Sequence, residues 1–154
     1  RGLELEAKFP MRMWMDDAPA LDFRANLGLN RSSIDTVPGP NNRLDAQVPL
    51  RFNLGLDYKP SQMPLTLGAS YSLQTAGLVR NSESQWNYST VGRSLEAYAL
   101  WKFDAMSNLR IVASNLIHQI PYSRSLYLGQ WGSSVRDSFN PPKLTVRVNY
   151  ELRF

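Results

Sequence analysis

The sequence contains no cysteine, which excludes disulfide bridges and thiolate metal sites. It has a single histidine, His118, so a histidine cluster for metal binding is also excluded. No apolar run is long enough for a transmembrane helix. The net charge is +4, but acidic and basic residues are interleaved, and the sequence shows no basic stripe of the kind that binds nucleic acid.

The most prominent pattern in the sequence is a regular alternation of apolar and polar residues. The stretch 143–154, KLTVRVNYELRF, carries an apolar residue at every second position. Because successive side chains of a strand point to opposite faces, this stretch predicts a strand with one apolar and one polar face. Strands of a soluble sandwich and of an outer-membrane barrel both alternate in this way, so the stretch alone leaves both folds open.

The same alternation recurs along the chain and predicts an all-β, antiparallel fold of about seven strands. We expect strands at 2–9, 20–30, 48–59, 65–73, 93–103, from 109 onward, and at 143–154. Short turns alternate with long connections at 32–47, 74–92 and 120–142, which we expect to be loops. Short periplasmic turns and longer extracellular loops are typical of outer-membrane barrels, and this rhythm favours a transmembrane β-barrel over a sandwich.

In such a barrel the apolar set of each strand would face lipid and the polar set would face the lumen. The residues predicted to face the lumen include Arg24, Arg51, Asp57, Glu96, Arg110 and Arg147. In a plugged barrel these charged side chains would hydrogen-bond to one another and to the plug, and in an open porin they would line a water-filled channel. Aromatic residues near the short turns would form the belt expected at the periplasmic boundary: Trp14, Tyr58, Trp101, Phe103, Tyr150 and Phe154.

Several segments resemble one family of outer-membrane proteins. The segments NLRIVASNLIHQ, RFNLGLDYKP and PLTLGASYSLQT, with the closing strand, are similar to the C-terminal end of TonB-dependent receptors. The resemblance implies a barrel of about twenty-two strands with a plugged lumen, of which this chain would supply about a third. It also implies that the closing strand carries the signal read by the barrel-assembly machinery, at Val148, Tyr150, Leu152 and Phe154.

The resemblance further implies a location in the bacterial outer membrane and the active uptake of a siderophore, glycan or similar nutrient. The implied partners are outer-membrane lipid, the barrel-assembly machinery, the remaining barrel strands and a TonB energy-coupling complex that acts through a plug. We therefore expect residues 1–154 to be the C-terminal segment of a barrel domain, with further strands before Arg1 and the N-terminal plug outside this sequence. No cofactor and no nucleic acid are expected.

Aromatic and arginine residues in the long connections are candidates for ligand contact, because binding residues concentrate on loops. They are Arg80, Trp86, Tyr88, Tyr122, Arg124, Tyr127, Trp131 and Arg136. The same residues would also serve to pack one loop against another. His118 lies near Ser114 and Asn115 in the sequence. A hydrolase would need these side chains within hydrogen-bond reach of one another, which proximity in the sequence does not show, and we expect no enzymatic activity. The alternatives are a passive porin, a small structural or adhesin barrel, and a soluble β-sandwich binding module.

Overall fold

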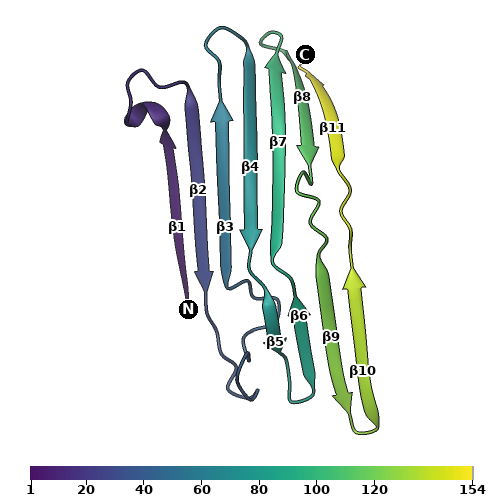
Figure 1. The fold of residues 1–154 in the computed structure, drawn as a ribbon. Coiled ribbons are helices and arrows are strands. Elements are labelled where there is room, and N and C mark those ends of the chain that lie inside the picture. Colours follow the sequence, from purple (N-terminus) through teal and green to yellow (C-terminus); the bar gives the residue numbers. More distant parts are fainter. Residues whose placement is uncertain (154) are drawn as a thin grey trace.

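The computed structural model describes residues 1–153, and Phe154, the last residue of the expected assembly signal, lies outside the described residues. The chain folds into two antiparallel sheets that follow one another along a single surface (Figure 1). The larger sheet has seven strands in the order β1-β2-β3-β4-β7-β8-β11. The smaller sheet has four, in the order β10-β9-β6-β5, and it extends the larger sheet at one end.

The strands of the larger sheet agree with the sequence prediction to within a few residues. They are β1 (Gly2–Pro10), β2 (Leu21–Asn30), β3 (Leu50–Tyr58), β4 (Leu65–Gln74), β7 (Gly92–Lys102), β8 (Ser107–Ser114) and β11 (Thr145–Leu152). A single 3-10 turn, η1 (Met11–Met13), follows β1 where Pro10 removes a backbone donor. The short connections lie at one end of the sheet and the long connections at the other, as the rhythm of the sequence predicts.

Two of the expected loops are wrong, because each contains a hairpin. The stretch 74–92 includes β5 (Gly77–Arg80) and β6 (Gln85–Ser89). The stretch 120–142 includes β9 (Tyr122–Gly129) and β10 (Gly132–Phe139). Strands β6 and β9 pair with each other, so the two hairpins combine into the four-stranded sheet.

Strand register keeps each face of the larger sheet uniform in chemistry. Leu5 lies opposite Leu27, which lies opposite Phe52, and Phe52 lies opposite Leu73. The adjacent row contains Glu6, Asn26, Asn53, Ser72 and Ser94. A slip of one residue in any pair would mix the two sets, so the alternation itself specifies the register. The two surfaces are called the apolar face and the polar face below.

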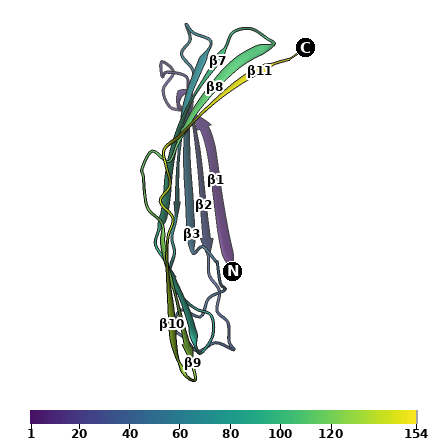
Figure 2. The ribbon, with the colours of Figure 1, turned by 90° about the vertical axis from the view of Figure 1, so that its right-hand side faces the viewer.

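The described chain forms one layer. Strands make substantial contacts only with their hydrogen-bonded neighbours, apart from η1, which touches β2. The side view shows no second layer on either side of the larger sheet (Figure 2). Very few described side chains are buried, chiefly Ala18, Val37, Val79 and Ser107. The larger sheet is also open, with β1 and β11 as its edges. Residues 1–153 therefore form an all-β antiparallel structure without a closed barrel, and the larger barrel expected from the sequence stays a prediction.

Candidate functional site

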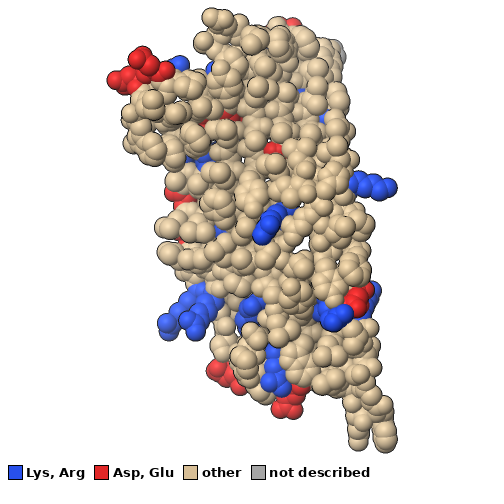
Figure 3. Space-filling view, in the orientation of Figure 1, with Lys and Arg blue, Asp and Glu red and all other residues tan. Residues whose placement is uncertain are grey.

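The apolar face is an exposed surface that crosses all seven strands of the larger sheet. Its residues stay partly open to their surroundings: Leu54 is 42% exposed and Val148 is 61% exposed. Little charge interrupts the seven-stranded part of the surface in Figure 3, whereas charged residues of both signs gather near the smaller sheet. An exposed apolar surface of this extent is uncommon on a soluble monomer and marks a surface that contacts lipid or another protein.

Aromatic rings border the apolar face at the end with the short turns. The ring centroids of Phe9 and Trp14 are 4.9 Å apart, and those of Phe103 and Tyr150 are 6.3 Å apart. Tyr58, in β3, and Trp101, in β7, lie close to the same end. In the expected assembly signal, Val148, Tyr150 and Leu152 share the apolar side of edge strand β11, opposite Ile111, Leu109 and Ser107.

The polar face brings together the residues that the sequence assigns to a lumen. By register, it carries Arg24, Arg51, Asp57, Glu96, Arg110 and Arg147. Leu100 and Val112 are apolar exceptions on this face. Whether the face borders a lumen stays a prediction, but the six residues do share one side of the sheet.

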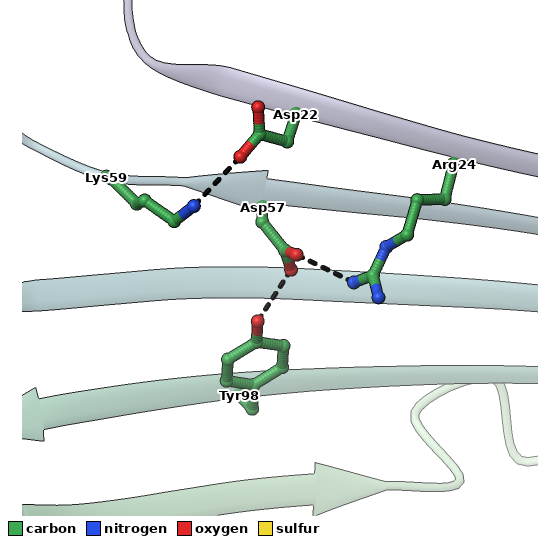
Figure 4. A network of polar contacts seen from close by, with 5 residues as sticks. All are labelled: Asp22, Arg24, Asp57, Lys59 and Tyr98. Atoms are coloured by element: carbon green, nitrogen blue, oxygen red, sulfur yellow. Dashed lines mark hydrogen bonds and ion pairs between the residues drawn. The ribbon is translucent and has the colours of Figure 1, made fainter. Parts of the chain in front are cut away.

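A charged network crosses the polar face near the short turns (Figure 4). The Asp57 carboxylate accepts hydrogen bonds from Arg24 Nη2 at 2.7 Å and from the Tyr98 hydroxyl at 2.6 Å. Beside it, Lys59 Nζ donates to Asp22 Oδ2 at 2.9 Å. Asp57 is thus paired with a cation on the adjacent strand β2, and Asp22 with a cation one residue beyond β3. Pairing of this kind avoids repulsion between like charges on a face that meets water.

Gly68 makes the reach of Tyr98 geometrically feasible. Asp57 in β3 and Tyr98 in β7 flank Gly68 in β4, so the tyrosine must cross one whole strand to reach the carboxylate. A Cβ atom added at Gly68 would lie 2.5 Å from Tyr98 Cζ, inside the space that the ring occupies. On its other side, the Tyr98 ring lies 4.8 Å from the Arg110 guanidinium carbon.

A hollow of about 460 Å³ lies where the two sheets meet, on the polar side. Its lining combines the polar-face residues Gln74 and Gly92 with side chains of the smaller sheet and of the connection 31–49. Asn87 and Arg43 both line the hollow, and the Oδ1 atom of Asn87 and the Nε atom of Arg43 are buried without a hydrogen-bond partner in the described chain. Ser123 and Ser125 complete a lining that is rich in polar side chains, so the hollow suits a polar occupant.

No sequence pattern singles out this hollow. Arg43 lies in a connection without periodicity, and Asn87 lies in a stretch that was expected to be a loop. The contacts that position the connection, such as the bond from the Arg80 amide to the Asn41 carbonyl, join segments far apart in the sequence. Contacts of this kind leave no local signal in the sequence.

The smaller sheet also has two unlike faces, and they divide the candidate ligand-contacting residues. One face, here called the aromatic face, consists of Leu78, Arg80, Trp86, Tyr88, Tyr122, Arg124, Leu126, Leu128, Val135, Asp137 and Phe139. The opposite face carries Asn87, Ser123 and Ser125, with Tyr127 and Arg136. Trp131 lies in the β9–β10 turn and is 94% exposed. The eight candidates therefore do not converge on one site.

A cross-strand ion pair anchors the β9–β10 hairpin on the aromatic face. Arg124 donates from Nε to Asp137 Oδ1 at 2.7 Å and from Nη2 to Oδ2 at 3.1 Å. The Tyr122 hydroxyl donates to the same carboxylate at 2.9 Å. The hydrogen bonds from Arg124 and then Tyr122 lower the pKa of Asp137 below its ordinary value. Partial desolvation and then the bond to Asp137 raise the pKa of Tyr122.

These contacts predict that the hairpin loses protection in acid. Because the folded-state pKa of Asp137 is depressed, its stabilising effect is complete above the unfolded pKa of about 3.9 and is lost as the pH falls through the lower folded value. Hydrogen-exchange protection factors of the β9 and β10 amides should therefore fall over that window. In Asp137→Asn this acid-dependent loss should disappear, and an Asn variant with the same pH profile would show that another group is responsible.

Among residues 1–153, no three His, Asp or Glu side chains gather as a metal site would require. Within the same residues, no helix has both the length and the apolar character needed to cross a bilayer. No family model, curated protein or solved structure matched the chain.

Proposed function

We propose that this chain forms part of the wall of an outer-membrane β-barrel that belongs to an active-transport receptor. The observation that carries the proposal is a single sheet whose apolar face has no cover and whose polar face carries ion-paired charges. A bilayer outside and water or a plug inside would satisfy both faces at once. A soluble sandwich would instead need a second layer on the apolar face, and the described chain supplies none.

The direction of the edge strands favours a larger barrel built with further strands. Seven antiparallel strands leave β1 and β11 running in the same direction. Joining these edges to each other, or joining β11 of one copy to β1 of the next, would create a parallel pair in an otherwise antiparallel wall. An odd number of additional strands avoids that pairing and keeps the wall antiparallel throughout, as outer-membrane barrels are.

The receptor assignment rests on the family resemblance and is supported by the hollow beside Arg43 and Asn87. In this proposal a nutrient is held at the polar side of the extracellular end before an inner-membrane energy complex drives its uptake. In this proposal the chain itself supplies part of the barrel wall, part of the polar lining of the lumen and part of the extracellular surface. A plug domain and the energy-coupling contact would belong to other parts of the protein.

The intact protein in lipid vesicles provides the test. A plugged receptor should give no faster swelling than empty vesicles when the vesicles are placed in an isosmotic monosaccharide solution. Rapid swelling would instead identify a passive porin. A protein that stays monomeric and soluble in buffer without detergent would contradict the membrane assignment altogether.

A further inference from the structure

The aromatic face of the smaller sheet lies on the same side as the apolar face of the larger sheet. The hollow establishes this relation, because Gln74 and Gly92 of the polar face border it together with Asn87, Ser123 and Ser125. Asn87, Ser123 and Ser125 occupy the face of the smaller sheet opposite Tyr88 and Tyr122. The polar face and this serine-bearing face therefore lie on one side, and the apolar and aromatic faces on the other. Figure 2 shows the connection 31–49 on one side of this region only, which leaves the aromatic face uncovered.

The chemistry of the aromatic face differs from that of the apolar face, which is mostly aliphatic. Tyr122 contacts Tyr88 and Phe139, with centroid distances of 6.1 Å and 4.9 Å. Arg80 lies over the Trp86 ring at 5.1 Å. Rings with a polar tip, next to guanidinium groups, suit the layer between hydrocarbon and water, where one end is apolar and the other wet.

The charge on this side is complementary to phosphate. Arg80 donates its side-chain hydrogen bonds to the carbonyl oxygens of Pro38, Ser82 and Glu83, which leave its positive charge unneutralised. Arg93 lies opposite Leu73 and therefore points to the same side. Among the residues of the aromatic face, Asp137 is paired with Arg124, so Arg80 supplies an excess positive charge there, and Arg93 adds a second one from the neighbouring end of the apolar face.

The length of the strands places the aromatic face at the right height. Phe139 and Tyr150 are separated by eleven positions in the sequence. Residues 140–144 between them lie outside the strands. Even if these residues are counted as extended, at about 3.3 Å per residue and a tilt of about 40°, the two rings are at most roughly 28 Å apart along the membrane normal, close to the thickness of a hydrocarbon core. If Tyr150 marks the periplasmic boundary, Phe139 lies at the opposite boundary.

From these observations we infer that the aromatic face lies against the phosphate-bearing headgroups of the outer lipid leaflet. This inference rests on the proposed membrane location and goes beyond it. It reassigns Arg80, Trp86, Tyr88, Tyr122 and Arg124 from ligand contact to lipid contact. A nutrient would then meet the opposite, serine-rich face, where the hollow lies.

Neighbouring positions on β10 allow a matched test, because Phe139 and Ser138 are both exposed but face opposite sides. A cysteine introduced at either position would be the sole cysteine of these 154 residues and would carry a nitroxide label in the intact protein in lipid vesicles. Collision rates with oxygen, which concentrates in lipid, and with a water-soluble nickel complex report the surroundings. The oxygen-to-nickel ratio should be several-fold higher at Phe139→Cys than at Ser138→Cys.

Leu54→Cys and Trp131→Cys serve as the lipid and water references, and Val135→Cys is a second variant on the aromatic face should Phe139→Cys fail to fold. A lipid-like label at Leu54 together with a water-like label at Phe139 would overturn this inference and leave the proposed function intact. A label at Phe139 shielded from both reagents would also overturn it, because protein would then cover the face. A water-like label at Leu54 would overturn the membrane proposal itself.

Discussion

Replacing Leu54 by arginine is expected to destabilise the protein by about 2–4 kcal/mol in a lipid bilayer, the cost of a cationic side chain on the lipid face near the midplane. Leu54 lies in the middle of the apolar face, in one row with Ala25, Tyr71 and Leu95. Leu54 is 42% exposed, and none of its row neighbours carries a negative charge that could pair with the arginine. Equilibrium unfolding of the intact protein in vesicles by urea would measure the loss.

Two control positions distinguish a bilayer on the apolar face from a protein cover. Ser70 lies at nearly the same height on the polar face, opposite Gly55 and Glu96, and Ser70→Arg should change the stability by no more than about 0.5 kcal/mol. Leu29 lies on the apolar face at the end with the long connections, where Leu29→Arg should cost only about 0–1 kcal/mol. Equal losses at Leu54 and Leu29 would indicate a protein cover rather than a membrane, since protein cover has no dependence on depth.

Alternation predicted the larger sheet well because a single physical rule governs it. Each strand must present one apolar face, so the period of two in 50–58 or 65–74 determines which side chains share a surface. Leu54, Tyr71 and Leu95 come from distant parts of the sequence, yet register places them in one row. Strand ends were predicted less well, because they depend on where neighbouring strands stop pairing.

The smaller sheet was not predicted from the sequence because charged residues interrupt its aromatic face. In 122–129, Tyr122, Leu126 and Leu128 keep the period of two, but Arg124 interrupts it. The structure shows that Asp137 neutralises Arg124 from the neighbouring strand, a pairing that the sequence does not reveal. The phase of the alternation also changes between the sheets, at Gly77, whose φ of +109° requires glycine.

The polar network was predictable in kind but not in detail. Inward-facing charges at Arg24 and Asp57 follow from alternation alone, whereas the bond from Tyr98 to Asp57 joins residues 41 positions apart and crosses an intervening strand. The available signal was the glycine between them. Gly68 faces the polar side, where a glycine gives room for a neighbouring side chain.

Gly68→Ala is therefore expected to destabilise the protein by about 1–2 kcal/mol, although alanine suits a strand better than glycine. The new methyl group would displace the Tyr98 ring and break its hydrogen bond to the Asp57 carboxylate, which is worth about 1.5–3 kcal/mol. The intrinsic preference of a strand for alanine over glycine returns roughly 0.5–1 kcal/mol. Urea unfolding in vesicles measures the net loss.

Gly28→Ala is the matched control, because a Cβ atom there would meet nothing closer than Arg51 Cβ at 4.0 Å. With no ring to displace, only the intrinsic preference remains, and this variant should gain about 0.5–1 kcal/mol. The two glycines share the polar face, so an opposite sign isolates the effect of Tyr98. In a Tyr98→Ala background, Gly68→Ala should likewise become stabilising, so the two substitutions should not be additive. The one close neighbour that remains, Asp57 Oδ1 at 2.7 Å from the new Cβ atom, ends a side chain that can turn aside. Should Gly68→Ala be equally stabilising with Tyr98 present, the ring does not lie over Gly68, and the bridge across β4 does not hold the polar face together.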